Sequence, residues 1–175
     1  MMASIILLAA GCTQAHEPGE VATGIYELTI ARGLDACSPS RPVGAMGSVA
    51  VLVDEGGLDA PVPDADLGPL ASPRVRLSQD REFHAETNRR VTGCDGAWVH
   101  EEWTLLDSGT RGFAITHLQE WRGLSSCVEG AVTMPGAPVG DCESERELEY
   151  RLAESCEAPC SLRLTSAASI ECACP

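Results

Sequence analysis

The sequence predicts an all-β domain, either an antiparallel β-sandwich or a small β-barrel of about eight strands, held together by disulfides. Apolar residues alternate with polar ones in successive runs, which is the period of a half-buried strand. Clusters of Gly and Pro separate these runs at the spacing of antiparallel sheets. The chain also holds nine cysteines, which an exported protein uses for disulfides. These patterns leave the choice between sandwich and barrel open.

The strand candidates follow one another along the chain. Segment 144–154 has a composition compatible with a helix, but its alternation favours a strand. The turn from Asp107 to Thr110 lies between two aromatic-bearing runs and predicts a hairpin. The alternating runs are 26–30, 49–53, 75–77, 98–106, 113–121, 148–152 and 162–164, and Ile170 follows the turn after the last run.

A second predicted hairpin near the C-terminus suggests how cysteines pair. Placing Leu164 opposite Ile170 puts Cys160 opposite Cys174, and directly opposed residues of antiparallel strands lie close enough for a disulfide. We therefore expect Cys160–Cys174, with a second bridge closing a Pro-rich loop and two more that follow by elimination. These three further bridges are Cys127–Cys142, Cys37–Cys94 and Cys156–Cys172.

The charge of the chain restricts its partners. The formal net charge is −14, from 26 acidic residues and 12 basic ones, and every basic residue is Arg. Such a field repels phosphate backbones, so we expect no nucleic-acid partner. It also repels anionic lipid headgroups, so attachment to a membrane requires an anchor rather than a basic patch.

The first residues have the character of an export signal. Residues 1–11 are uncharged and largely apolar and end in small residues, and they are too few to cross a bilayer, which takes about 20 residues. The stretch Leu8-Ala9-Ala10-Gly11-Cys12 resembles the lipobox of bacterial lipoproteins. This resemblance implies that the Cys12 thiol carries a lipid. An ordinary secretory signal and a buried N-terminal strand are the alternatives.

The number of cysteines agrees with this resemblance. Nine is an odd number, and assigning Cys12 to the lipid leaves eight cysteines for four disulfides. We expect a signal peptide at 1–11, a lipidated polar tether at 12–22 and one β domain at 23–175, a length that suits a single core. The expected location is the cell envelope, anchored by lipid to the outer membrane and facing the periplasm or the cell surface.

Two groups of side chains could hold a metal, and a simpler interpretation is favoured for each. The cysteines of segment 156–174 could form a four-thiolate zinc site, but their spacing fits neither common knuckle pattern. The acids of segment 54–66 could bind calcium, but the EF-hand pattern is absent and an exposed loop is expected. These acids are Asp54, Glu55, Asp59, Asp64 and Asp66.

The strands of the hairpin around Asp107 also carry histidines and acids. Pairing Trp103 with Ile115 places Glu101 opposite His117, and such a pair could bind a metal or act as acid and base. An incidental ion pair on a solvated strand face is the favoured interpretation. The full group is His100, Glu101, Glu102, His117 and Glu120.

The segment Leu105-Leu106-Asp107-Ser108-Gly109-Thr110 resembles the active-site motif of aspartic proteases. That mechanism requires two Asp residues sharing a proton, and this chain has one copy of the motif. A retroviral-type enzyme obtains the second copy by dimerising, which would make Asp107 the catalytic residue. We expect Asp107 instead to be a solvated turn residue, because Asp, Ser, Gly and Thr are common in hairpin turns.

The same hairpin holds Trp98, Trp103 and Trp121, which we expect in the core, with a ligand platform as the alternative. The leading functional hypothesis is a lipid-anchored cell-envelope lipoprotein with a non-catalytic binding or structural role, without cofactor or metal. Its expected partners are the membrane and either another envelope protein or a small ligand. The alternatives are a small-ligand carrier with a lipocalin-like cavity and, less favoured, the dimeric hydrolase that uses Asp107.

The lipid anchor gives a first testable prediction. If Cys12 is acylated, the mature protein partitions into the detergent phase on phase separation, and Cys12→Ala moves it to the aqueous phase, since the −14 charge gives it no other affinity for a membrane. Mass spectrometry of the N-terminus is the matching control. Wild-type protein in the aqueous phase that still carries the residues before Cys12 would contradict the prediction.

Overall fold

The computed structural model describes residues 21–38, 43–62, 73–128, 130–134, 136–158, 160–166 and 169–174, and all that follows concerns these residues. Ten strands are present among them, with short 3-10 turns at Gln79–Arg81 and Leu124–Ser126. The strands are β1 (Gly24–Asp35), β2 (Gly44–Asp54), β3 (Gly57–Pro61), β4 (Arg74–Ser78), β5 (His84–Arg90), β6 (Trp98–Gly109), β7 (Gly112–Arg122), β8 (Cys142–Ser155), β9 (Ser161–Ser166) and β10 (Ser169–Ala173).

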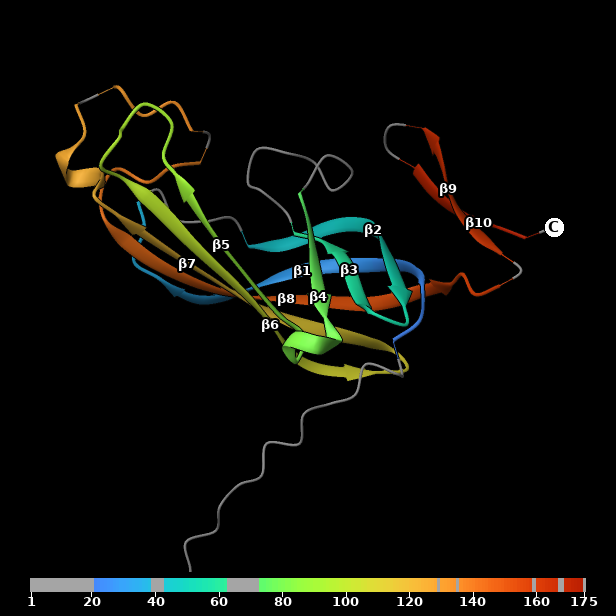
Figure 1. Ribbon diagram of the computed structural model, residues 1–175. Coiled ribbons are helices and arrows are strands. Elements are labelled where there is room, and N and C mark those ends of the chain that lie inside the picture. Colours follow the sequence, from blue (N-terminus) through green and yellow to red (C-terminus); the bar gives the residue numbers. More distant parts are fainter. Residues whose placement is uncertain are drawn as a thin grey trace, which may run out of the picture.

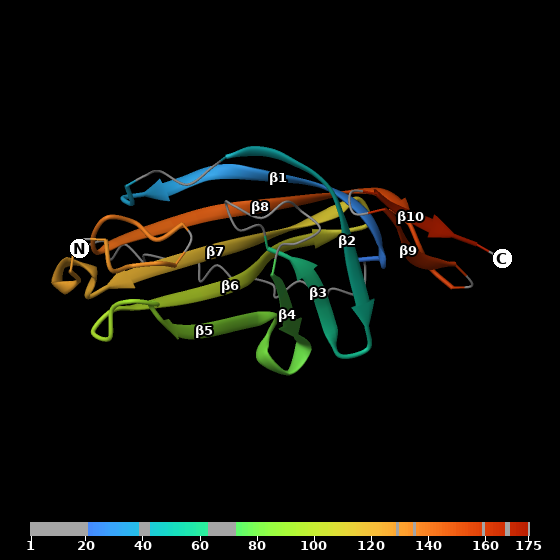
Figure 2. The same cartoon turned by 90° about the horizontal axis from the view of Figure 1, so that it is seen from above.

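Strands β1 to β8 form a closed antiparallel barrel in sequence order, which confirms the barrel alternative. Each strand pairs with the next, and β8 pairs back with β1 over most of its length (Figures 1 and 2). Closure removes exposed sheet edges. The weakest seam lies between β4 and β5, which are paired only at Ser78 and His84 and then diverge.

The alternation that predicted the strands is present in the structure. Along β8, buried and exposed residues alternate from Cys142 to Arg151 without interruption, and β7 alternates between buried and half-buried positions. Two strands gave too little signal to be predicted. Strand β3 is short and bounded by Gly57 and Pro61, while β5 is mostly polar and so shows no apolar period.

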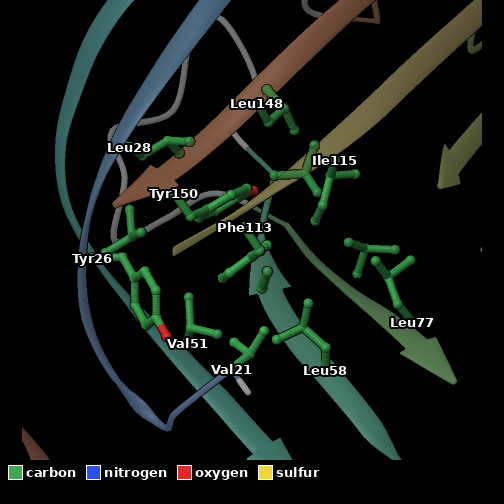
Figure 3. Close-up of a cluster of buried hydrophobic side chains, with 14 of the residues drawn as sticks. Val21, Tyr26, Leu28, Val51, Leu58, Leu77, Phe113, Ile115, Leu148 and Tyr150 are labelled. Carbon is green, nitrogen blue, oxygen red and sulfur yellow. The ribbon is translucent and has the colours of Figure 1, made fainter. Parts of the chain in front are cut away.

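One end of the barrel is filled by a hydrophobic core in which side chains of six strands point toward one another (Figure 3). The Phe113 ring stacks on Tyr150 with ring centroids 4.4 Å apart and meets the edge of Tyr26 at 5.3 Å. The buried Tyr150 hydroxyl donates to the Pro61 carbonyl oxygen at 2.8 Å. Val21, which we assigned to the end of the tether, is buried in this core.

A second, smaller cluster lies at the opposite end of the barrel, around the buried Trp121. Two disulfides belong to it, Cys37–Cys142 and Cys94–Cys127, so the predicted Cys37–Cys94 and Cys127–Cys142 pairs are wrong. The reason is the pairing of β1 with β8, which places the end of one strand beside the start of the other. Cys94 and Cys127 lie in two loops that pack at the same end.

The C-terminal hairpin of β9 and β10 lies outside the barrel, at the end away from that cluster (Figure 2). Its register places Leu162 opposite Cys172, as predicted, and the disulfides Cys156–Cys172 and Cys160–Cys174 are both confirmed. These sulfurs are bonded to one another, so the four cysteines do not form a thiolate zinc site. Four disulfides point to an oxidising environment outside the cytoplasm. Among the described residues, no helix is long and apolar enough to cross a membrane.

The hairpin of β6 and β7 differs in detail from the prediction. Its turn is at Thr110–Arg111, so Asp107 lies on β6 rather than in the turn. The later turn shifts the register, and a bulge between Leu105 and Asp107 offsets part of this shift, so Trp103 lies opposite His117 rather than Ile115. Asp107 is exposed, as expected, and its carboxylate accepts from the Ser108 amide at 2.8 Å.

The acidic segment is only partly a loop. Asp54 ends β2 and pairs with Arg76, and Asp59 lies on β3 and pairs with Arg74, because β3 and β4 are neighbours. These arginines occupy the carboxylates that calcium would require. Asp64 and Asp66 lie outside the described residues.

Candidate functional site

The inward-facing residues of β6, β7 and β8 form three layers along the barrel axis. On β7, Phe113 and Ile115 belong to the large core, Trp121 belongs to the small cluster, and His117 and Gln119 lie between them. On β8, Ser144 and Arg146 occupy the same middle layer. We call this layer the polar band, which consists of Arg89, Glu101, His117, Gln119, Ser144 and Arg146.

The register explains why these side chains meet. Glu101, Gln119 and Ser144 are directly opposed across β6, β7 and β8 and form one rung. Trp103, His117 and Arg146 form the next rung in the same way. Each of these positions points inward, so the strand alternation that buries the core also buries the members of the polar band on β6, β7 and β8, whereas the Arg89 side chain is 47% exposed.

Glu101 lies at the centre of the band and is only 4% exposed. Its Oε1 accepts from Gln119 Nε2 at 2.7 Å and from His117 Nε2 at 3.3 Å. Its Oε2 accepts from both Nε and Nη2 of Arg89, the former at 2.9 Å. Donors from β5 and β7 therefore satisfy both carboxylate oxygens. The favoured interpretation, an incidental ion pair on a solvated strand face, was wrong.

The hydrogen bonds of His117 define its protonation. Arg146 Nη2 lies 3.0 Å from His117 Nδ1, and a guanidinium can only donate, so Nδ1 is the acceptor. The ring proton is then on Nε2, which faces Glu101. His117 is therefore neutral, and its ring stacks on Trp103 with centroids 5.0 Å apart.

The surroundings of Glu101 keep it ionised. Burial alone would raise its pKa, but hydrogen bonds from His117 and Gln119, together with the nearby positive charge of Arg89, outweigh burial and hold the pKa below its usual value of 4.5. A carboxylate with such a lowered pKa is a weak base near neutral pH. The arrangement is thus better suited to holding a polar ligand than to moving protons.

Buried polar atoms of this region that have no hydrogen-bond partner in the described protein include Trp103 Nε1, Gln119 Oε1 and Ser144 Oγ. The orientation of the Gln119 amide follows from its partner, because only its nitrogen can donate to Glu101. Its oxygen is therefore an acceptor, while Trp103 Nε1 is a donor. Buried groups of this kind are normally hydrogen-bonded, so both atoms indicate a polar binding partner.

A pocket of about 360 Å³ adjoins the polar band. It lies where β4 and β5 diverge from the Ser78–His84 pair, with Val75 on one side and Ala85 and Thr87 on the other. Trp103 and Gln119 line it together with the charged members of the band. Pockets for small molecules range from about 300 to 1,000 Å³, so this one suits a small ligand.

The three Trp side chains differ in role. Trp121 is in the core, as expected, but Trp103 is half-buried at the pocket and Trp98 is 38% exposed on the outer face. The outer face of β6 also carries His100 and Glu102. Arg89, Gln119, Ser144 and Arg146 were not among the predicted site residues. The signal that could have found them is a polar residue at an inward position of a strand.

No protein-family model matches the chain, and neither a curated protein nor a solved structure matches it.

The buried carboxylate gives a prediction about stability. Glu101→Gln removes the charge-assisted hydrogen bonds of Glu101. Because the Arg89 side chain is 47% exposed and can be solvated, the free energy of unfolding near pH 7 is expected to fall by about 1–2 kcal/mol. A lowered carboxyl pKa stabilises the fold above the unfolded pKa, and this contribution is lost as pH falls through the folded pKa. The difference from wild type should therefore shrink as the pH falls below about 4.5. Urea unfolding at several pH values measures it.

The matched control is Glu147→Gln, which changes an exposed acid on the outer face of β8. Its effect is expected to stay within about 0.5 kcal/mol at every pH. A Glu101→Gln effect that is equally small, or that does not change with pH, would contradict an ionised and buried Glu101.

Proposed function

We propose that this protein is an exported, lipid-anchored binding protein of the cell envelope that holds a small polar molecule inside its barrel. The observation that carries the proposal is the polar band, with its unpartnered donor at Trp103 and acceptor at Gln119 beside a pocket of about 360 Å³. Of the hypotheses drawn from the sequence, this combines the lipoprotein with the ligand carrier.

The position of the pocket supports a polar ligand rather than a lipid or a long hydrocarbon. The apolar end of the barrel interior is filled by its own side chains, among them Tyr26, Phe113 and Tyr150. The space that remains adjoins Glu101, His117 and Arg146, where an apolar group would leave polar atoms without partners. The ligand is expected to offer an acceptor to Trp103 and a hydroxyl or amine hydrogen to Gln119.

The same side chains favour a non-catalytic role. A general base works best when its pKa is near the working pH, whereas the pKa of Glu101 is held below its usual value of 4.5. His117 is held between Arg146 and Glu101, so both of its ring nitrogens are already engaged. Asp107 is exposed on β6, remote along the strand from the pocket. These features support binding as the activity of the domain.

The anchor and the location rest on the sequence and on the disulfides. The lipobox-like segment ending at Cys12 supports lipidation, and the four disulfides agree with an oxidising compartment. Attachment to the outer membrane, facing the periplasm or the cell surface, is the location we propose. A binding domain held there would capture or present its ligand at the membrane.

The ligand prediction is tested with Trp103→Phe, which keeps an aromatic ring on His117 but removes the Nε1 donor. Because this donor has no partner in the described protein, its loss should leave the melting temperature nearly unchanged. A ligand that uses it should bind about 2–10-fold more weakly, the value of one hydrogen bond. Immobilised protein is incubated with a polar metabolite extract of the producing cells, and retained compounds are identified by mass spectrometry.

Trp98→Phe is the matched control, because Trp98 lies on the same strand but on the outer face. Wild type and Trp98→Phe should retain the same compound, and Trp103→Phe should retain less of it. The proposal is wrong if wild type enriches no compound, or if the two variants retain it equally.

A further inference from the structure

The outer face of the barrel carries a second group of side chains with ligand chemistry, separate from the polar band. Glu86 lies on β5, and His100 and Glu102 lie on β6. One ligand atom from each of the three lies within 4.8 Å of the other two. We call these three residues the outer-face cluster.

The register places the two acids of this cluster against each other. Glu86 and Glu102 are directly opposed across the β5–β6 pair, and like charges in this position destabilise a sheet. The neighbouring pair on the same face is Asn88 and His100. Two carboxylates and an imidazole therefore share one small area of sheet surface.

The hydrogen bonds of His100 hold its imidazole ring in the orientation that is usual for a metal-binding histidine. His100 Nδ1 lies 3.0 Å from Asn88 Oδ1, to which it donates, so the other nitrogen, Nε2, is directed toward Glu102 at 2.7 Å. Without a metal, a proton on Nε2 makes the hydrogen bond to Glu102, and a metal ion would replace that proton and bind both atoms. Ligating histidines commonly have this arrangement, with one ring nitrogen fixed by an oxygen acceptor and the other on the metal.

We propose that Glu86, His100 and Glu102 bind a divalent transition-metal ion of the zinc class, with water completing the coordination. One imidazole and two carboxylates suit zinc, whose nitrogen and oxygen ligands lie at about 2.0–2.2 Å. His100 is 16% exposed and holds its position, while Glu86 is exposed and can rotate toward the ion. The ion would also neutralise the two opposed acids. Glu86 also lines the interior pocket at the seam between β4 and β5, whereas His100 and Glu102 do not, so the two proposed sites share only this residue.

The test is isothermal titration of ZnCl₂ into the tag-free, full-length protein in detergent. The expected result is one high-affinity ion per chain. His100→Gln should weaken this binding at least about tenfold, and Asn88→Ala should weaken it less, about tenfold at most, because Asn88 only positions the ring.

His84→Gln is the matched control. His84 lies on β5 two residues from Glu86, on the same sheet face, and its ring nitrogen meets Thr104 rather than a carboxylate. Zinc affinity should be unchanged in this variant and in Trp103→Phe, which alters only the interior pocket. The proposal fails if wild type binds no zinc, if His100→Gln binds as tightly as wild type, or if His84→Gln is weakened as much as His100→Gln.

Discussion

The ionised carboxylate of Glu101 is the group on which the organisation of the barrel interior depends. A buried charge is unfavourable unless it is paired and hydrogen-bonded, so Glu101 requires donors on both oxygens. Arg89 supplies them from β5, and His117 and Gln119 supply them from β7. Arg146 on β8 then fixes the ring of His117. One buried acid thus links four neighbouring strands.

The three layers of the barrel interior have different roles. The large core around Phe113 and Tyr150 stabilises one end, and the Trp121 cluster with two of the disulfides stabilises the other. A disulfide that closes a long loop, as Cys37–Cys142 does, contributes about 2–4 kcal/mol in typical cases. The middle layer does not need to be apolar for the fold to be stable, and this is where the pocket lies.

The short contact between β4 and β5 provides the space for the pocket. These strands meet at one residue pair, and the pocket occupies the space where they diverge. A full ladder of hydrogen bonds that continued the Ser78–His84 register would place Val75 opposite Thr87 and close the space between the strands. The pocket is therefore a consequence of a short contact between two strands rather than of missing side chains in the core.

The sequence predicted features that follow from the alternation of residues along one strand. It was less informative about features that depend on the register between strands. Alternation predicted β8, and parity of the cysteines predicted four bridges. The wrong disulfide pairs involve Cys37 and Cys142, which are 105 residues apart and meet only because the barrel closes. Likewise, one bulge near Leu105 changes which residue opposes Trp103, and no local pattern announces it. The polar band was not predicted, because Glu101 and His117 were expected on a solvated strand face and its other members were not singled out.

The protonation of His117 tests the account most directly, because it depends on every member of the network at once. Nitrogen NMR of the imidazole distinguishes the Nε2–H form, the Nδ1–H form and the doubly protonated ring. The hydrogen bonds to Arg146 and Glu101 predict a neutral ring with its proton on Nε2 from about pH 5 to about pH 8, although free histidine titrates in that range. A doubly protonated ring at neutral pH, or a proton on Nδ1, would contradict the network and the polar pocket built on it.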